Sequence, residues 1–222
     1  MIWLALVALV LLAGFSVRYS WWRPAVDDAR PRILMYHMVS EARRGGVFNK
    51  LRVAPKNFEA QLRVLREGGW HVAIISALAQ PQSLPATTVI ITYDDGYEDN
   101  LVNADPLLER YGACATLYLV EDRFERDWST SKKAHHDSGE LMHEPKLSDA
   151  QVQTLLASGR WELGGHTRTH ANLARLDEAA CREEIVDARG SLAARFDVPL
   201  KSFAYPFGIY GARDVVVVRD AG

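Results

Sequence analysis

The sequence predicts an α/β domain in which parallel strands alternate with helices, arranged as an open sheet or a barrel. Short apolar, β-branched runs alternate with segments whose apolar residues recur at helical spacing. The chain has 222 residues, of which 48% are hydrophobic and 24% charged, enough for one domain with a full core. Polar residues also gather directly after several apolar runs. In parallel sheets, the carboxyl ends of strands are where functional sites lie.

The expected elements follow one another in a regular order. The runs expected to form strands are 33–39, 70–75, 89–93, 115–120, 161–163 and 202–205. The segments expected to form helices are 58–67, 105–111, 147–158 and 176–196. Gly112 is suited to end the second helix, while Ser148 is suited to cap the third and Gly159 to end it. Strands separated by helices in this way indicate parallel βαβ units.

The N-terminal segment is expected to lie outside this domain. Residues 2–17 are apolar apart from Ser16, and the aromatic and arginine residues that follow bring the segment to the ~20 residues that a bilayer core requires. A membrane anchor over residues 1–22 is therefore predicted, then a linker over 23–32 and the main domain over 33–222. A cleaved signal peptide is less favoured because no small-residue cleavage site follows. A buried core helix is the other alternative.

Charge and cysteine usage restrict the partners and the environment. The formal net charge is −2 and no basic run occurs, so nucleic acid is not expected as a partner. Every arginine near the apolar segment follows it, which by the positive-inside rule places the main domain on the cytoplasmic face. Cys114 and Cys181 lie far apart without metal-binding spacing, and we expect both to be reduced.

Two adjacent carboxylates are the most informative feature of the sequence. Asp94 and Asp95 follow an apolar strand run, 87–91, and Gly96 provides a sharp exit from it. Burying two carboxylates without partners is costly, because a low dielectric penalises both charges. A divalent metal ion is the simplest partner for them, and a turn or helix cap is the alternative.

Matching nitrogen ligands occur further along the chain. The spacing of His166 and His170 predicts that both imidazoles lie on one face of a helical turn. With Asp95 they would form a two-histidine, one-carboxylate site with open positions for water and substrate. Asp94 can then take a proton from an attacking water, and a backbone N–H at the turn 206–208 can stabilise the oxyanion that develops. A packed core pair is the alternative for the two histidines.

Other histidines lie outside this pattern. Residues 121–146 are polar and irregular, and we expect a surface insertion beside the site. His135 and His136 in this insertion can bind metal, although adjacent loop histidines are more often solvated. His37 follows the first expected strand, and either an approach to the site or a packed core position is expected.

These motifs resemble those of the polysaccharide deacetylases of carbohydrate esterase family 4. The family's T-F-D-D-G motif corresponds to Thr92–Gly96, and its H-[S/T]-x-x-H motif corresponds to His166–His170. The segments 35–37 and 203–208 are most similar to the branch that acts on exopolysaccharide amino sugars. The resemblance covers residues 33–222.

The resemblance implies a distorted (β/α)7-type barrel and a hydrolase that removes N-acetyl groups from amino sugars of a poly- or oligosaccharide. Asp95, His166 and His170 would hold one divalent ion, with Zn²⁺ expected. Asp94 would be the catalytic base, and the backbone N–H of Phe207 would face the oxyanion. Three residues within or beside these motifs would contact the substrate: Tyr93, Tyr205 and Pro206.

The chain departs from the family pattern at two places. Ala204 stands where the family's third motif, R-x-P-x-G, has an arginine that orients the base, so other groups would orient Asp94. No histidine follows His170, whereas the family's general acid is a histidine in a later motif. The last barrel strand is also expected to be missing, and with it the domain to be C-terminally incomplete. The family usually acts outside the cytoplasm, which conflicts with the orientation that the flanking charges predict.

Three interpretations of the function follow. The first is a membrane-anchored, metal-dependent N-deacetylase of an acetylated amino-sugar glycan. The second changes the substrate to a lipid-linked sugar, deacylated or deformylated at the cytoplasmic membrane face. The third is a glycan-binding relative that keeps the metal site without catalysis. Replacing Asp94 by Asn separates the first two from the third, because it should abolish hydrolysis while sparing binding.

Overall fold

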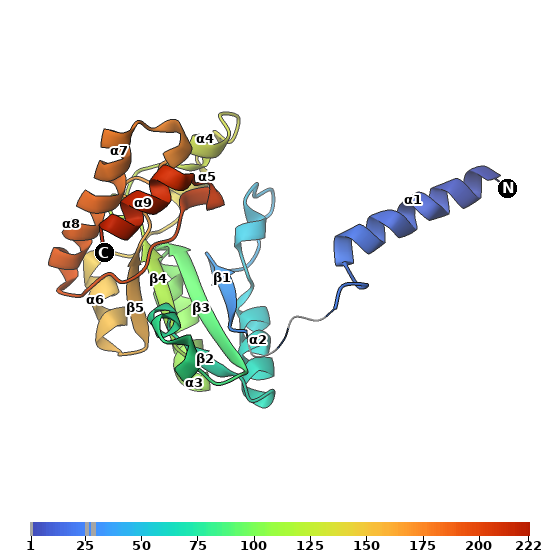
Figure 1. Ribbon diagram of the computed structural model, residues 1–222, viewed down its shortest axis with the longest axis horizontal. Coiled ribbons are helices and arrows are strands. Elements are labelled where there is room, and N and C mark those ends of the chain that lie inside the picture. The colour runs from blue at the N-terminus through green and yellow to red at the C-terminus, as the bar shows by residue number, and fades with distance from the viewer. Residues whose placement is uncertain (1, 25–26, 28–29) are drawn as a thin grey trace.

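The computed structural model describes residues 2–24, 27 and 30–222. Helix α1 (Ile2–Tyr19) stands apart from the rest of the described chain, and none of its residues is buried (Figure 1). It is apolar and long enough to cross a membrane or to serve as a signal sequence. Residues 25–26 and 28–29 of the expected linker lie outside the described residues.

One parallel sheet forms the centre of the described domain. Its five strands are β1 (Arg32–Tyr36), β2 (His71–Ala73), β3 (Thr88–Asp95), β4 (Ala115–Leu119) and β5 (Trp161–Gly165). β1 pairs along one edge of β3, and β2 and β4 pair one after the other along its other edge. β5 extends the sheet beyond β4. β3 is buried over its whole length, which explains its continuous apolar run.

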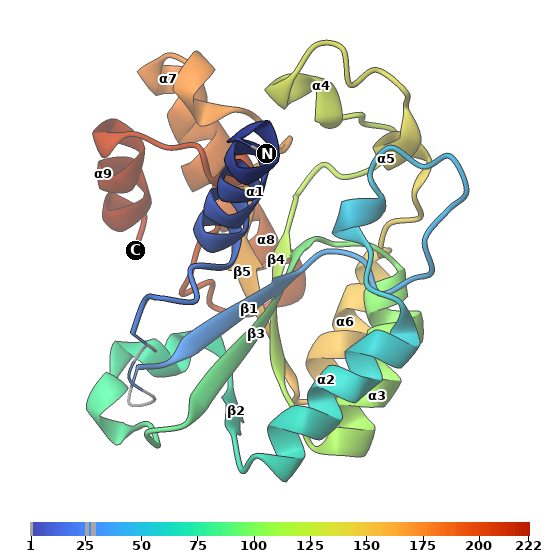
Figure 2. The same ribbon diagram turned by 90° about the vertical axis from the view of Figure 1, so that its right-hand side faces the viewer.

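Helices cover the sheet and close the main core. Figure 2 shows three of them together on one side of the sheet: α2 (Pro55–Glu67), α3 (Asp105–Tyr111) and α6 (Asp149–Ala157). Phe58 and Leu62 of α2 and Leu155 of α6 are buried in this core. These apolar positions recur at the spacing of a helix with one buried face.

The C-terminal part contributes a second group of helices. Helices α7 (Glu178–Arg182) and α8 (Ala188–Phe196) are joined by a π-helical turn and together form the long helix expected over 176–196. Helix α9 (Ala212–Asp220) packs against them through Cys181, Ile185 and Val217. Two short helices, α4 (Ser129–Lys132) and α5 (Glu140–His143), lie in the insertion. Both cysteines are free, as expected.

Tyr93 belongs to an aromatic cluster of the core. Its ring centroid lies 5.5 Å from that of Tyr36, 6.1 Å from that of Phe58 and 5.1 Å from that of Trp161. Successive residues of a strand point to opposite faces, so Tyr93 points away from the face of Asp94. The side chain is fully buried. The structure therefore places Tyr93 in the core, and not where a substrate contact was expected.

The expected helix ends are confirmed, but one expected strand is wrong. The Ser148 side chain accepts a hydrogen bond from the backbone of Gln151, and Gly112 adopts the left-handed conformation after α3. The run 202–205 makes only a single bridge, between Phe203 and Gly165. The chain then turns at Pro206, which has no N–H to continue a ladder. The α/β class and the parallel sheet are confirmed. The described strands form an open sheet, and the barrel stays a prediction.

Candidate metal centre and active site

The register of three strands brings the acidic and histidine motifs together. Asp95 ends β3 and pairs with Leu119 of β4, which in turn pairs with Gly165 at the end of β5. The backbone N–H of His166 then donates to the carbonyl oxygen of Leu119 at 3.1 Å. Asp95 and His166 thus lie at the same end of the sheet, where the strands have their carboxyl ends, and at the ends of the two strands that flank β4.

The Asp95 carboxylate contacts both imidazoles. Its Oδ1 atom lies 3.3 Å from Nε2 of His166 and 3.2 Å from Nε2 of His170. The three candidate ligand atoms lie within 4.8 Å of one another, and all three side chains are buried. The three residues expected as metal ligands are therefore brought together by the fold.

The end of β3 has a backbone that requires glycine after the two aspartates. Asp95 has a φ of 77° and Gly96 a φ of 83°. A Cβ on Gly96 would lie 2.4 Å from Cδ1 of Leu119, so a side chain is excluded there by both conformation and space. A positive φ is costly for Asp95 and persists only where the surrounding structure enforces it. This sharp exit leaves both Asp94 and Asp95 facing one cavity.

The histidine segment is not the helical turn that its spacing predicted. Thr167 and His170 have positive φ values of 66° and 58°, and residues 166–170 form an irregular loop. The Glu184 carboxylate holds this loop by accepting hydrogen bonds from the backbone N–H groups of Arg168 and Thr169 and from the Thr169 hydroxyl. A carboxylate from the π-helical turn thus replaces the local bonds of a helix.

Further contacts orient the two imidazoles. Nδ1 of His166 donates to the carbonyl oxygen of Ala204 at 2.9 Å, and Nε2 faces Asp95. The ring of Trp128 stacks on His170 at 5.1 Å, and the Phe207 ring packs edge-on against His170 at 4.6 Å. Ala204, which stands in place of the family's arginine, therefore acts on the site through its carbonyl oxygen.

The two adjacent carboxyls have opposite protonation tendencies. Burial raises the pKa of Asp94, and the nearby His166 and His37 offset this only in part. Burial also acts to raise the pKa of Asp95, but His170 and His166 outweigh it and hold that pKa well below its usual range. The pair therefore combines an ionised ligand with a carboxyl suited to take up a proton.

A cavity of about 520 Å³ opens over this site. Asp94, Asp95 and the two histidines line it, as do Tyr205, Phe207 and His37, whereas Pro206 is buried and does not line it. The insertion lies beside the site as expected. Its residues on the cavity are Trp128, Ser129, Lys132, Lys133, His136 and Leu141. His135 does not line the cavity.

The donor set fits a divalent metal ion. Oδ1 of Asp94 and Oδ1 of Asp95 are buried and have no hydrogen-bond donor within the described part of the chain. Two imidazole nitrogens and one carboxylate oxygen are ligands typical of Zn²⁺ in hydrolases, where positions stay open for water and substrate. Such a site at the carboxyl edge of a parallel sheet defines the class of metal-dependent α/β hydrolases.

Comparison with known proteins places the chain in a family of this class. The polysaccharide deacetylase family profile matches residues 82–222, which include both motifs and more than half of the chain. The chain belongs to the polysaccharide deacetylase family.

Individual relatives agree with this assignment. YxkH of Bacillus subtilis (strain 168), a proposed polysaccharide deacetylase, is 26% identical over 207 residues, which cover 91% of this chain and 66% of YxkH. The poly-β-1,6-N-acetyl-D-glucosamine N-deacetylase of Staphylococcus aureus (strain MRSA252) is 24% identical over 185 residues, which cover 77% of this chain and 58% of that protein. This chain therefore spans less than two thirds of the length of either relative.

A solved structure shows the same fold. The Streptococcus pyogenes deacetylase PplD, determined in complex with acetate, matches with a TM-score of 0.70. The match covers 86% of this chain and 79% of the PplD chain at 23% identity. The parallel sheet described above is thus an arrangement found in deacetylases of known structure.

Two residues that shape the site were not found from the sequence. Trp128 stacks on His170 but lies in an irregular insertion, where its only signal is an aromatic residue within a polar segment. Glu184 holds the histidine loop but lies in a long helix, where an acidic residue is common. Both residues contact the histidine loop from segments that are distant in the sequence, and no local sequence pattern reveals such contacts.

Proposed function

We propose that this protein is a metal-dependent N-deacetylase that removes acetyl groups from N-acetylated amino sugars of a glycan. The observation that carries this proposal is Asp94, whose buried Oδ1 atom has no hydrogen-bond donor among the described residues, beside the buried Asp95, His166 and His170. Membership of the polysaccharide deacetylase family supports it.

The residues of the centre have separate proposed roles. Asp95, His166 and His170 hold one divalent ion, with Zn²⁺ expected from the donor set. When bound, this ion supplies Lewis acidity to the attacking water and to the acetamide carbonyl. Asp94 accepts a proton from the water as its oxygen attacks the carbonyl carbon. The carbon–nitrogen bond then breaks and the proton passes to the nitrogen, which gives acetate and a free amine.

The turn Pro206–Gly208 supplies the opposite side of the proposed site. Phe207 has a φ of 60°, and the turn borders the cavity. The backbone N–H of Phe207 is proposed to donate to the developing oxyanion. Tyr205 lines the cavity and is proposed to contact the sugar. Pro206 is buried, and its proposed role is to hold the turn in place.

The limits of the domain belong to the same proposal. Helix α1 is proposed to anchor the protein in a membrane within residues 1–22. Residues 23–32 link this anchor to the deacetylase domain, 33–222. The parallel sheet is proposed to be the larger part of a distorted (β/α)7-type barrel.

Acetate release from an N-acetylglucosamine oligomer tests the proposal. The full chain in detergent is expected to release acetate with zinc present and to stop when a chelator is added. Asp94→Asn is expected to bind zinc but not to release acetate. Asp122→Asn is the matched control, because Asp122 is a half-exposed carboxylate outside the cavity that pairs with Arg126, and it is expected to keep the activity.

A different result assigns a different role. Zinc binding without acetate release from any N-acetylated sugar would contradict the deacetylase. If Asp94→Asn then left glycan binding unchanged, the protein would be a glycan-binding relative that keeps the metal site.

A further inference from the structure

The cavity over the metal centre is charged differently in its inner and outer parts. Among the described residues that line it, the acidic side chains are Asp94 and Asp95, and both are buried in the centre. Lys50, Lys132 and Lys133 line the outer part and are exposed. We call these three lysines the cationic rim. With a divalent ion at Asp95 the lining is net positive, although the chain as a whole has a net charge of −2.

The cationic rim is not neutralised by protein carboxylates. In the part of the chain that the structure describes, none of the three lysines forms an ion pair. Nζ of Lys132 lies 5.7 Å from the ring centroid of Phe207, next to the proposed oxyanion site. Desolvation and His135 lower the pKa of the neighbouring His136, and the rim lysines lower it further. Lys50 therefore acts on the same side chain, His136, as Lys132 and Lys133, although it lies in a distant segment of the sequence.

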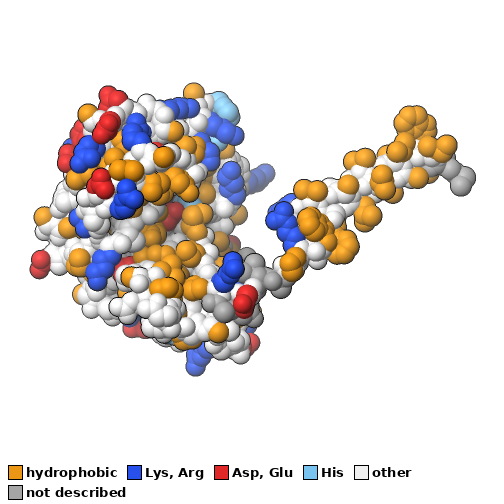
Figure 3. Space-filling model, viewed as in Figure 1, with side chains coloured by type: hydrophobic (Ala, Val, Ile, Leu, Met, Phe, Trp, Pro, Cys, Tyr) orange, Lys and Arg blue, Asp and Glu red, His pale blue; other side chains and the backbone are white. Residues whose placement is uncertain are grey.

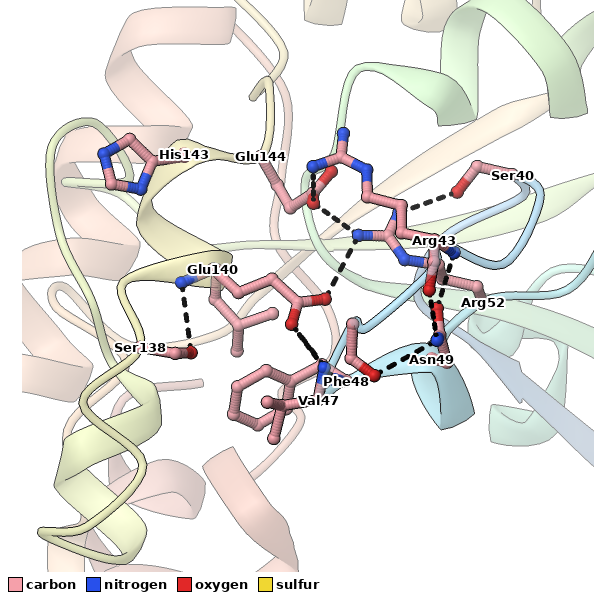
Figure 4. Close-up of polar contacts among 12 residues, drawn as sticks. Ser40, Arg43, Val47, Phe48, Asn49, Arg52, Ser138, Glu140, His143 and Glu144 are labelled. Carbon is pink, nitrogen blue, oxygen red and sulfur yellow. Dashed lines mark hydrogen bonds and ion pairs between the residues drawn. The ribbon is translucent and has the colours of Figure 1, made fainter.

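A buried ionic cluster holds the segment that carries Lys50 against the insertion that carries Lys132 and Lys133 (Figure 4). The Glu140 carboxylate accepts hydrogen bonds from the backbone N–H groups of Val47 at 2.6 Å and Phe48 at 3.3 Å. Arg52 pairs with Glu144 and lies 3.5 Å from Glu140. We call Arg52, Glu140 and Glu144 the Arg52 cluster. Lys50 lies between Phe48 and Arg52, so its backbone is held against the insertion that carries the other two lysines.

Much of the rest of the cavity wall is apolar. Its apolar residues include Met35, Phe48, Leu51, Leu141 and Phe207. Figure 3 shows hydrophobic side chains gathered in the hollow between the part that carries α7 and α9 and the part that carries β2, with Lys and Arg side chains beside it. A site with an apolar wall, a metal centre and unpaired lysines is complementary to a sugar that also bears a negative charge.

We propose that the substrate carries a phosphate or a carboxylate close to the reacting acetamide, and that Lys50, Lys132 and Lys133 bind this group. This inference rests on the proposed deacetylase function and narrows its substrate class. Ammonium groups form strong, charge-assisted hydrogen bonds to either anion. A neutral N-acetylglucosamine oligomer leaves the rim without a partner, and each free amine formed on such a polymer is repelled by it.

A set of matched substrates tests the inference. The full chain in detergent, loaded with zinc, is assayed on the methyl glycoside of N-acetylglucosamine, on N-acetylglucosamine 1-phosphate and on N-acetylmuramic acid. N-acetylglucosamine joined to a prenyl chain through phosphate is the fourth substrate. The expected kcat/KM is about tenfold or more higher for a charged substrate than for the neutral glycoside. The phosphate and carboxylate arms identify the anion, and the prenyl arm separates a lipid-linked from a free phosphate.

Variants of the three lysines show whether the cationic rim causes the preference for charged substrates. The triple variant Lys50→Gln, Lys132→Gln, Lys133→Gln is expected to bring the ratio of charged to neutral kcat/KM close to one, chiefly through KM. Lys56→Gln, an exposed lysine on α2 outside the cavity, is the matched control and is expected to leave the ratio unchanged. A second readout avoids catalysis. N-acetylglucosamine 1-phosphate should bind zinc-loaded Asp94→Asn protein in calorimetry about tenfold or more tighter than the same protein with the three rim substitutions.

The outcomes separate the two proposals. Equal kcat/KM for charged and neutral substrates, unaffected by the triple variant, would overturn the anionic substrate and leave the deacetylase in place. If no substrate is hydrolysed, the deacetylase fails. The calorimetry then tests only whether the cationic rim binds the anionic group. Equal binding with and without the three lysines would overturn that part of the proposal.

Discussion

The inner and outer parts of the cavity are built in different ways. Asp95 and His166 of the inner part are buried and held by the ends of β3 and β5. Lys50 and Lys132 of the outer part are exposed and come from the short 3₁₀ helix Asn49–Leu51 and from the insertion. The chemistry of the site thus depends on the register of the sheet, whereas its recognition depends on contacts between surface segments.

The two parts should also respond differently to substitution. Charges in the inner part interact at low dielectric, so their loss changes metal binding and kcat. Charges on the rim are screened by salt, so their loss changes KM and the dependence on ionic strength. Four predictions test this contrast, from the largest expected effect to the smallest.

Asp95→Ala tests the inner part most severely. Removal of the carboxylate leaves two imidazoles, and zinc affinity is expected to fall by more than about 100-fold, because even contacts outside the ligand shell are worth about 10–100-fold. Zinc content per chain after dialysis and acetate release measure the effect. Asp122→Ala should bind zinc like the parent protein. Full zinc content in Asp95→Ala would show that Asp95 is not a ligand.

Asp94→Asn separates proton transfer from metal binding. The amide keeps the shape of the side chain but accepts no proton, so acetate release is expected to fall by about 10²–10⁴-fold. Zinc content should not change, since Asp94 is not one of the three clustered ligands. Loss of zinc from this variant would instead make Asp94 a ligand, and the distinction between the two carboxylates would fail.

Glu144→Gln tests whether the Arg52 cluster supports the outer part alone. Arg52 is buried, and the substitution leaves it with Glu140 at 3.5 Å as its nearest carboxylate. We expect a loss of about 2 to 3 kcal/mol in the free energy of unfolding. KM for a charged substrate should rise more than kcat falls.

A double variant is the control for this effect. Arg52→Met with Glu144→Leu removes the buried arginine together with its nearest carboxylate, while Glu140 keeps the hydrogen bonds from the backbone N–H groups of Val47 and Phe48. Part of the lost stability should therefore return. Thermal unfolding of the three proteins measures it. A fall in kcat equal to the rise in KM would show that the cluster also positions the metal centre.

Asp99→Asn tests a pH effect on the free energy of unfolding that arises beside the Arg52 cluster, which supports the outer part of the cavity. Asp99 lies beside Glu144 and Arg52, and burial raises its pKa to about 6 from the usual 3.8. The folded state therefore binds more protons than the unfolded state between these two values. Because of this, the free energy of unfolding falls as pH rises through the window, and the loss is complete above about pH 6.

The Asn variant should lack this loss. At pH 7 it is expected to be more stable than the parent by roughly 1 to 3 kcal/mol, and at pH 4 the two should be equal. Unfolding by denaturant at both pH values measures the difference. A constant difference at the two pH values would show that the raised pKa of Asp99 is not its cause.

Local patterns in the sequence predicted the inner part well. The acidic pair directly follows a continuous apolar run, which places it at a strand end, and the expected ligands Asp95, His166 and His170 do converge. The core position of Tyr93 could also have been predicted from the alternation of side chains along a strand. Tyr93 precedes Asp94 and must point to the opposite face, so a core position follows from strand geometry alone.

The outer part had no such local signal. Lys50 and Lys132 meet at one cavity because residues about ninety positions apart, such as Phe48 and Glu140, are hydrogen-bonded. The irregular loop at 166–170 likewise depends on Glu184. The order of the strands, with β2 and β4 sharing one edge of β3, is also absent from any single segment.

The sequence by itself determined the types of ligand, the segments that carry them and most helix ends. It did so because alternation, capping and the cost of buried charge act within a few residues. Only the tertiary structure decided the walls of the cavity and the unpaired state of its lysines. These depend on pairings between distant segments, whose free energy arises only when the chain is folded.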